Sequence, residues 1–312
     1  MMSRAWPYPD LRNGTTVNLI TDIHMGKRSF VDQWAAKMSD DLYRMRAAMA
    51  GSVQAGDAID WFNDPSTPED NLYKVWRDAH KTQLGLPLAE CVGNHDLASH
   101  ATGGPVRNVQ QWATAVGVSS QNTVVTMGGV KVITVGPDTW GFQGVGGPDQ
   151  SVLSPATLTW LDGQLSAAGS TPCWIAAHSP LYEQFPAYSD GWLQAPKAEL
   201  DALISAHPNV IGWLSGHLHT DITITPEHAG VITVGSRKIF AVNGPPIGGR
   251  LTNIDFNGHQ WVSPDNVGSG VSQSMLVTYL GDAIDVRWRS HTGRRWAKDG
   301  NGNQMRHILL KA

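Results

Sequence analysis

The sequence is poor in cysteine, in charged residues and in long apolar runs, and each shortage excludes a class of protein. Two cysteines, Cys91 and Cys173, among 312 residues are too few for a disulfide framework or a thiolate-rich zinc site. Both lie in apolar segments, so we expect buried free thiols. No apolar run reaches the roughly 18 residues of a membrane span, and the first ten residues lack the hydrophobic stretch of a secretory signal. We therefore expect a cytoplasmic protein without a membrane span.

Charged residues make up only 16% of the chain, and the 23 Lys and Arg are outnumbered by 27 Asp and Glu, for a net charge of −4. This balance excludes a strongly basic protein that coats nucleic acid, because such a protein binds phosphates through an excess of cations. Hydrophobic residues make up 41% of the chain, which is enough for a large core. The 13 tryptophans fit either a Trp-rich core or an exposed binding rim.

Short apolar runs alternate with amphipathic segments over the first two thirds of the chain. Strand-like runs occupy 17–20, 88–92, 130–135, 174–177 and 210–214, with a weaker one around Val53. Apolar residues recur every three or four positions in 31–49, 72–79, 106–116, 154–165 and 196–206, which is the spacing of a helix face. Ser154-Pro155 is an N-cap followed by a proline at the first helical position. This alternation predicts βα units and an α/β fold.

The helical spacing stops at about residue 222, and strand-like runs follow at 222–224, 231–234, 239–242, 251–256, 275–279 and 284–288. Gly281-Asp282 joins the last two as a hairpin. Neither a repeat nor a low-complexity linker divides the chain. We therefore expect one domain over 1–312, with a motif core at about 15–245, a β-rich finish at 246–290 and a loosely held polar tail at 291–312.

Five polar clusters stand where predicted strands end. They are Asp22-Ile23-His24, Gly56-Asp57, Gly93-Asn94-His95-Asp96, His178 and Gly216-His217-Leu218-His219. Because functional sites of α/β sheets form where the carboxyl ends of strands meet their loops, these clusters can converge although they are far apart in the sequence. The backbone around Gly56-Asp57 is the least certain, because the run at 50–55 is short of apolar side chains.

Each cluster taken singly has an ordinary explanation. An Asp-x-His is most often a surface loop, and His217-x-His219 fits a solvated strand end or a one-metal site. Together, the clusters collect carboxylates, an amide oxygen and several imidazoles, donors that suit Mn, Fe or Zn better than Mg. Two neighbouring ions need a shared ligand, and Asp57 is the candidate for it.

Five of the 12 histidines fall inside the clusters. We expect the other seven at the surface or at helix ends: His80, His100, His207, His228, His259, His291 and His307. His100 is a further candidate contact, because it follows His95 by five residues.

In this order and spacing, the five clusters resemble the calcineurin-like metallophosphoesterase superfamily. Its pattern is Asp-x-His, Gly-Asp, Gly-Asn-His-Asp/Glu, His and Gly-His-x-His, and the resemblance runs from Asp22 to His219, about two thirds of the chain. It implies an α/β fold, a four-layer α/β/β/α sandwich of two mixed β-sheets flanked by helices. We expect the β-rich last third, from residue 222 on, to form the second of these sheets.

The resemblance also implies a metal-dependent hydrolase of phosphoric esters with two divalent ions. Asp22, His24, Asp57 and His219 would hold one ion, and Asp57, Asn94, His178 and His217 the other, with Asp57 as the bridge. A hydroxide between the ions would attack phosphorus in line with the departing oxygen. His95 would stabilise the transition state or protonate the leaving group, and Asp96 would orient His95. Manganese is expected to support activity better than magnesium.

The sequence indicates the substrate less directly than it indicates the reaction. Relatives of this kind act on phosphomonoesters, phosphodiesters, nucleotides, phospholipid headgroups and DNA ends. We expect a small phosphate ester such as a nucleotide, with a diester slightly ahead, because the Asp22-x-His24 pair is intact. The lack of basic runs argues against a processive nuclease and against stable binding of nucleic acid. The cyclic-nucleotide branch often has an Arg soon after Gly-Asn-His-Asp, and 96–100 contains none.

Several side chains outside the clusters can reach a substrate. Trp61, Trp140 and Trp192 lie in loops where they can stack on a base, and Arg107, Arg237 and Arg250 can meet a phosphate, although packing and surface roles are the commoner ones. Three alternatives stay open: a catalytically silent binding scaffold of the same fold, a nuclease or nucleotidase of the same superfamily, and a secreted or particle-associated esterase.

Overall fold

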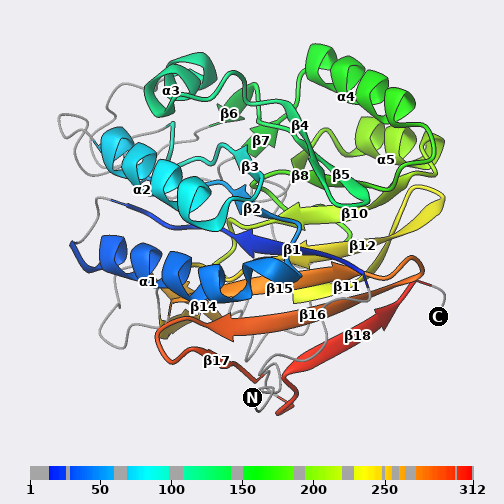
Figure 1. The fold of residues 1–312 in the computed structure, drawn as a ribbon. Coiled ribbons are helices and arrows are strands. Elements are labelled where there is room, and N and C mark those ends of the chain that lie inside the picture. Colours follow the sequence, from blue (N-terminus) through cyan, green and yellow to red (C-terminus); the bar gives the residue numbers. More distant parts are fainter. Residues whose placement is uncertain are drawn as a thin grey trace.

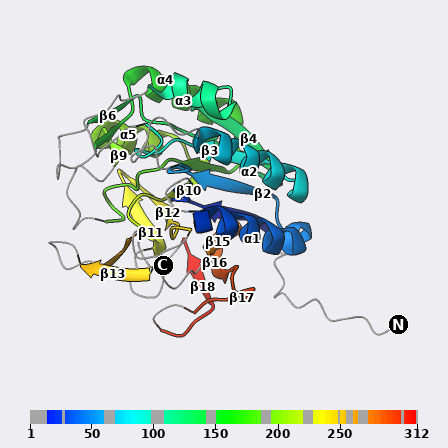
Figure 2. The same cartoon turned by 90° about the vertical axis from the view of Figure 1, so that its left-hand side faces the viewer.

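Two mixed β-sheets pack face to face, with helices on their outer faces, in a computed structural model of the chain (Figure 1). The structure describes residues 14–25, 29–59, 69–97, 108–141, 150–185, 194–219, 228–247, 250–254, 260–263, 272–298 and 301–310. Figure 2 shows α4 at one end of the molecule and β16 and β18 at the other, with β2 and β10 between them. The expected α/β architecture with two mixed sheets is confirmed.

The first sheet contains seven strands in the order β17-β16-β15-β1-β2-β3, with β18 also paired to β16. The strands are β1 (Thr15–Ile20), β2 (Gly51–Ala55), β3 (Leu88–Cys91), β15 (Gln273–Tyr279), β16 (Ala283–Ser290), β17 (Arg295–Trp296) and β18 (Met305–Leu309). β1, β2 and β3 are parallel, as βα units require, and β15 returns antiparallel to β1. All five residues of β2 are buried, so the weak run at 50–55 is an interior strand.

The second sheet has the order β11-β12-β10-β8-β5-β4. Its strands are β4 (Thr123–Met127), β5 (Val130–Thr134), β8 (Cys173–Ala176), β10 (Val210–Ser215), β11 (Ala229–Val234) and β12 (Arg237–Asn243). The expectation that the β-rich last third forms this sheet is correct for β11 and β12 and wrong for β15 and β16. β15 and β16 extend the first sheet instead, because β15 pairs along the whole length of β1. Two small sheets join β13 (Arg250–Ile254) to β14 (Gln260–Ser263), and β6 (Thr139–Gly141) to β7 (Gln150–Val152) and β9 (Gln194–Ala195).

The helices cover the outer faces of the two large sheets. α1 (Ser29–Met45), the short 3-10 helix η1 (Arg46–Ala48), α2 (Glu69–Leu84) and α3 (Val109–Val116) belong to the first sheet, and α4 (Pro155–Ala168) and α5 (Lys197–Ala206) to the second. The ends of these helices follow local rules. Ser154 caps α4 through a hydrogen bond to the N–H of Thr157, and α3 ends at Gly117 in a left-handed conformation.

The core between the sheets is built from alternate strand residues that include Val17, Val53, Phe240 and Val286. The largest fully buried side chains are aromatic: Trp112, Trp174, Trp213 and Trp288. For these four residues the Trp-rich core is therefore the correct alternative. Both cysteines are buried and free, as expected.

The carboxyl-terminal segment and three histidines differ from the expectation. The polar tail contains β17 and β18, which pair with β16, so it is held by a sheet edge. His80, His228 and His291 are buried rather than at the surface. Polar partners inside the fold explain all three: Nδ1 of His80 lies 2.8 Å from Oγ of Ser39, Nδ1 of His228 lies 3.1 Å from the carbonyl oxygen of Asn243, and Nδ1 of His291 lies 2.9 Å from Oδ2 of Asp41.

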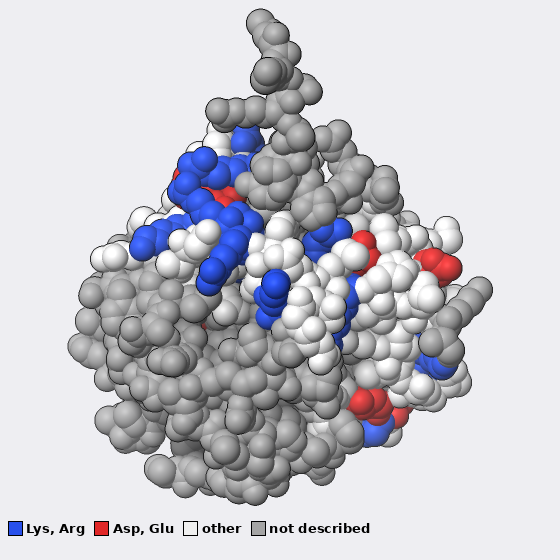
Figure 3. Space-filling view, turned by 90° about the horizontal axis from the view of Figure 1, so that it is seen from below, with Lys and Arg blue, Asp and Glu red and all other residues white. Residues whose placement is uncertain are grey.

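Basic side chains gather on the face seen from below, where Lys and Arg outnumber Asp and Glu over part of the described surface (Figure 3). The side chains of Arg44 in α1 and Arg294 beside β17 are exposed, and both form ion pairs with Asp40. Ion pairs as exposed as these contribute little to stability. Among the described residues, the helices are too short or too polar to cross a bilayer.

Candidate metal centre

All nine residues singled out for chemistry lie just beyond the carboxyl ends of five strands. Asp22 and His24 follow β1, Asp57 follows β2, Asn94, His95 and Asp96 follow β3, His178 follows β8, and His217 and His219 follow β10. β1, β2 and β3 run parallel to one another in one sheet, and β8 runs parallel to β10 in the other. The contacts described below show that these strand ends meet, so the fold brings the five clusters together.

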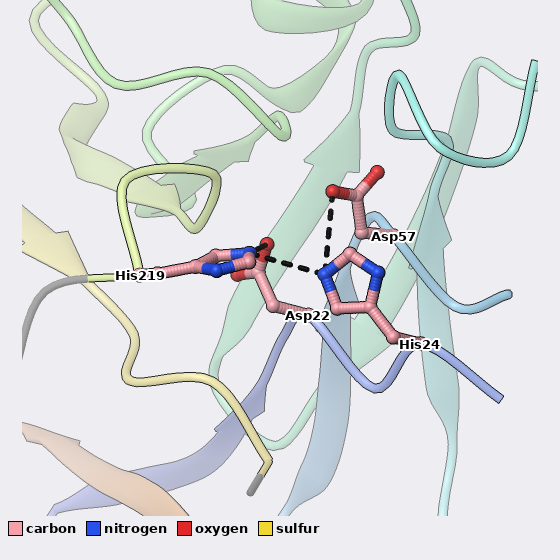
Figure 4. A group of neighbouring side chains, drawn as sticks. All are labelled: Asp22, His24, Asp57 and His219. Carbon is pink, nitrogen blue, oxygen red and sulfur yellow. Dashed lines mark hydrogen bonds and ion pairs between the residues drawn. The ribbon is translucent and has the colours of Figure 1, made fainter. Parts of the chain in front are cut away.

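The first group contains Asp22, His24, Asp57 and His219, whose side chains converge in Figure 4. Nε2 of His219 lies 2.9 Å from Oδ1 of Asp22 and 3.1 Å from Nε2 of His24. Nε2 of His24 lies 3.8 Å from Oδ2 of Asp57. Each of the four residues offers one donor atom within 4.8 Å of the others, and all four side chains are buried.

The second group contains Asp57 again, with His178 and His217. Nε2 of His178 lies 3.2 Å from Oδ2 of Asp57 and 3.2 Å from Nδ1 of His217. The same Nε2 lies 3.1 Å from Oδ1 of Asn94, which adds an amide oxygen to the group. Asp57 is therefore common to two neighbouring sets of donors, and together the sets are consistent with a dimetal site.

Hydrogen bonds from the surrounding protein fix one oxygen of each carboxylate. Oδ2 of Asp22 accepts from the hydroxyl of Thr21 (2.6 Å) and from the N–H of His217 (3.1 Å), while Oδ1 faces His219. Oδ1 of Asp57 accepts from the N–H of His95 (2.9 Å), while Oδ2 faces the imidazoles of the two groups. In each carboxylate, one oxygen is held by the fold and the other faces the donor group.

His178 is oriented by the backbone. Its Nδ1 lies 2.7 Å from the carbonyl oxygen of Ala55, and since a carbonyl only accepts, Nδ1 must carry the hydrogen. Nε2 then presents a lone pair when the ring is neutral, and that atom is the one that faces Asp57 and Asn94. The carbonyl behind the ring thus selects the tautomer that a metal ligand needs.

Backbone conformation sets these residues apart. Six non-glycine residues in the described part of the chain have a left-handed φ, and five of them belong to the two groups: Asp22, His24, Asp57, His217 and His219. Their φ angles lie between 47° and 73°. A left-handed residue other than glycine costs about 1–2 kcal/mol, so the fold stores strain where the donors are presented.

Glycines in the motifs let the chain pass close to the donors. A Cβ on Gly93 would lie 2.1 Å from Oδ1 of Asp57, and a Cβ on Gly56 would lie 2.4 Å from Nδ1 of His178. Any side chain at either position would displace a donor. The glycines of Gly-Asp and Gly-Asn-His-Asp are therefore explained by close approach to the site.

Charges within the site favour ionised carboxylates. Burial alone would raise the pKa of Asp22, but His219 and His178 outweigh it and lower the pKa to about 2. The pKa of Asp57 is likewise held well below its usual range, because His178 and His95 outweigh the effect of burial. Burial would lower the pKa of His178, yet Asp57 and Asp22 raise it to about 9. Buried carboxylates that stabilise a nearby positive charge are the environment that divalent cations require.

His95 and Asp96 lie beside the donors. The ring of His95 packs edge-on against His24, with ring centroids 4.6 Å apart, and His95 is partly exposed. Asp96 is buried, and its carboxylate accepts hydrogen bonds from the N–H groups of Gly93 (2.7 Å) and Ile59 (3.0 Å). These bonds join the turn that carries Asn94 and His95 to the loop that follows Asp57.

Other sequence candidates have different outcomes. Arg237 donates to backbone carbonyls of 204–208 at the end of α5, so it holds that helix end. The remaining candidates lie outside the described residues or in strands whose side chains are not described: Trp61, Trp140, Trp192, His100, Arg107 and Arg250. Sequence reasoning missed Thr21, Gln54 and Asn243, which contact the ligand-bearing turns. Their only signal is a polar residue at the end of an apolar strand.

Comparison with known proteins supports the same assignment. Residues 15–221 match the family described as calcineurin-like phosphoesterases. The chain belongs to the calcineurin-like phosphoesterase family. Every member of the two donor groups lies within the matched residues, so this phosphoesterase has a buried Asp/His cluster suited to binding metal. A search of curated proteins found no match.

Solved structures show the same fold at low sequence identity. A dimetal phosphatase from Danio rerio is 13% identical, with a TM-score of 0.62 over 95% of this chain and 99% of that one. The purple acid phosphatase PPD1 from yellow lupin is 12% identical, with a TM-score of 0.51 over 97% of this chain and 55% of that one. At these identities the likeness shows the fold alone.

Proposed function

We propose that this phosphoesterase hydrolyses a small phosphate ester, with diesters slightly preferred over monoesters, and that it uses two divalent metal ions. The observation that carries the proposal is the sharing of Asp57 by two adjacent donor groups. Asp22, His24, Asp57 and His219 would hold one ion, and Asp57, Asn94, His178 and His217 the other. Carboxylate oxygens mixed with imidazoles favour Mn, Fe or Zn over Mg.

When bound, two such ions polarise the phosphoryl group and supply the attacking nucleophile at neutral pH. The chain's own residues would position the ions and assist the leaving group. Oδ1 of Asp22 and Oδ2 of Asp57, which face the imidazoles, would hold the ions, because the other oxygen of each carboxylate is fixed by Thr21, His217 or His95. Ions held by carboxylates fixed in this way would keep the substrate phosphate in one orientation before the reaction begins.

His95 would act on the leaving group. Its ring lies against His24, and its partial exposure lets it reach a bound substrate. As an imidazolium it would stabilise charge on the departing oxygen or protonate it. Asp96 would hold the turn that carries His95, through the N–H groups of Gly93 and Ile59. His95 is therefore the proposed catalytic acid, and Asp96 acts through it.

Substrate size and the competing functions follow from the site and the charge of the chain. With a net charge of −4, the chain does not offer the general excess of cations that a processive nuclease uses, so we favour a small ester such as a nucleotide. A silent binding scaffold of this fold is the other candidate. The nine retained site residues favour the enzyme, since a scaffold has no need of them.

Turnover tests the proposal directly. Metal-free protein should hydrolyse neither bis-p-nitrophenyl phosphate nor p-nitrophenyl phosphate, and Mn²⁺ should restore turnover better than Mg²⁺, with the diester rate ahead. His219→Ala should abolish this recovery, whereas His307→Ala, a surface histidine paired with Asp285, should not change it. A protein that binds Mn²⁺ and hydrolyses neither ester would favour the scaffold.

A further inference from the structure

Two of the ligand-bearing turns share one construction. Asp57 (φ 51°) and His217 (φ 73°) each follow a glycine directly, and the carbonyl of that glycine accepts a hydrogen bond from a buried side-chain amide. The donors are Gln54 for Gly56 and Asn243 for Gly216. Both amides are completely buried.

Gln54 lies in β2 two residues before the glycine that it holds. Its Nε2 donates to the carbonyl of Gly56 (2.8 Å), and its Oε1 accepts from the N–H of the same residue (3.2 Å). The Gly56 carbonyl also accepts from the N–H of Asp22 (3.1 Å). One side chain thus fixes both backbone polar groups of Gly56, and the N–H of Asp22 connects the same carbonyl to the segment that follows β1.

Asn243 comes from a distant part of the chain. It ends β12, lies beside Ser215 of the parallel strand β10, and donates from Nδ2 to the carbonyl of Gly216 and to Oγ of Ser215 (3.0 Å). Its position lies beyond residues 15–221, the part that matches the family. The β-rich last third of the chain therefore contributes to the turn that carries His217.

In both turns the amide is a second donor to a carbonyl that already has a backbone partner. The carbonyl of Gly56 also accepts from the N–H of Asp22 (3.1 Å), and the carbonyl of Gly216 also accepts from the N–H of Leu218 (2.9 Å). A carbonyl oxygen has two lone pairs, so the amide fills the second one at the peptide that directly precedes a left-handed residue. A side-chain amide with its own rigid packing holds the peptide in one orientation, and the orientation of the peptide sets the direction of the next side chain.

We propose that Gln54 and Asn243 are positioning residues of the metal centre, which hold Asp57 and His217 in the left-handed conformation that directs their donor atoms to the ions. The proposal rests on the proposed function, since it presumes metal binding at this site. Neither residue is a ligand in it: each amide nitrogen donates to a backbone carbonyl and acts through the neighbouring ligand.

Binding of Mn²⁺ alone provides the test. Gln54→Met and Asn243→Leu keep the size of the side chain and remove the donor. Isothermal titration of metal-free protein should show Mn²⁺ affinity reduced about 10- to 100-fold in each variant, the usual effect of losing a partner behind a ligand. Asn209→Leu is the matched control, because Asn209 is a buried amide that donates to the carbonyl of Leu165 (2.8 Å) at the other end of β10. The control should keep the Mn²⁺ affinity within about twofold of wild type, which is well below the roughly 10-fold loss expected when a partner behind a ligand is removed.

The outcomes separate this inference from the proposed function. Wild-type protein that takes up no Mn²⁺ contradicts the proposed function itself. Wild-type protein with two bound ions and both variants at wild-type affinity overturns the positioning role alone. If both variants lose the fold, as seen by circular dichroism, while Asn209→Leu keeps it, the amides hold the sheets rather than the turns, and the role is overturned as well.

Discussion

The backbone N–H of His95 donates a hydrogen bond to Oδ1 of Asp57 over 2.9 Å. One peptide therefore links the residue proposed to assist the leaving group to the carboxylate shared by both donor groups. The bond uses the backbone of His95 and leaves its ring beside His24. Substitution of the His95 side chain can remove the acid without removing the support of Asp57.

His95→Ala should keep both metal ions and lose turnover. Because the backbone bond to Asp57 remains, the expected loss is that of a general acid, about 10²–10⁴ in kcat for esters with poor alkyl leaving groups. Esters of p-nitrophenol, whose leaving group needs no proton, should lose much less. Steady-state rates on both ester types, with metal content measured on the same samples, check this. Equal losses on both would assign His95 to another role.

Asp57→Asn should lose both ions, since the shared carboxylate loses its charge while the side chain keeps its shape. Metal content after dialysis in Mn²⁺ should fall below one ion per chain. Asp162→Asn is the control, because Asp162 is a surface acid whose Oδ1 lies 2.7 Å from Nε2 of His207. An Asp57→Asn protein that retains two ions would refute the shared ligand.

Asp41→Asn should destabilise the fold far more than Asp40→Asn beside it. Asp41 is buried and accepts two hydrogen bonds of 2.7 Å from Arg289, which is also buried, so the substitution leaves a buried guanidinium without its counter-charge. Such a loss costs about 3–5 kcal/mol. The Asp40 side chain is 44% exposed and pairs with surface arginines, so its loss should cost less than about 1 kcal/mol. The free energies of urea unfolding should differ accordingly, and similar values for the two variants would contradict this account of Asp41.

His80 should make the fold less stable in mild acid. Burial lowers the pKa of His80 from 6.5 to about 4, so between these values the unfolded chain binds a proton that the folded protein does not. The contribution of neutral His80 to stability is complete above pH 6.5. It falls by about 1.4 kcal/mol per pH unit as the pH decreases and levels off near pH 4, a total of about 3 kcal/mol.

A His80→Gln variant should lack this part of the pH dependence, and urea unfolding at several pH values measures it. If His80→Gln and wild type show the same slope between pH 6.5 and 4, the buried neutral state of His80 is refuted.

The sequence predicted the α/β fold and the five clusters because their signals are local, whereas the sandwich of two sheets was implied by the family resemblance. A strand, a polar residue at its end and the following helix are all readable within about twenty residues. Pairing between distant strands is not local, so the return of β15 along β1 was assigned to the wrong sheet. The burial of His80 and His291 was missed for the same reason, since their partners Ser39 and Asp41 lie on α1.

In the weak strand at 50–55, Gln54 both obscures the strand in the sequence and supports the site in the structure. Gln54 lowers the hydrophobicity of β2 and made the strand uncertain, yet its amide holds Gly56 before Asp57. Asn243 gave only the weak signal of a polar residue that ends an apolar strand, because its partner Gly216 is 27 residues away in the sequence. Residues that support a site from neighbouring strands cannot be found from motif spacing alone.

Electron paramagnetic resonance of Mn²⁺-loaded protein tests the central claim most directly. If Asp57 bridges two ions, they lie about 3.5–4 Å apart, the usual spacing of such pairs, and two equivalents of Mn²⁺ should give the spectrum of an exchange-coupled pair. The coupled signal should disappear in Asp57→Asn. Two Mn²⁺ ions with independent, uncoupled signals, or a single ion at saturation, would contradict the shared-carboxylate centre.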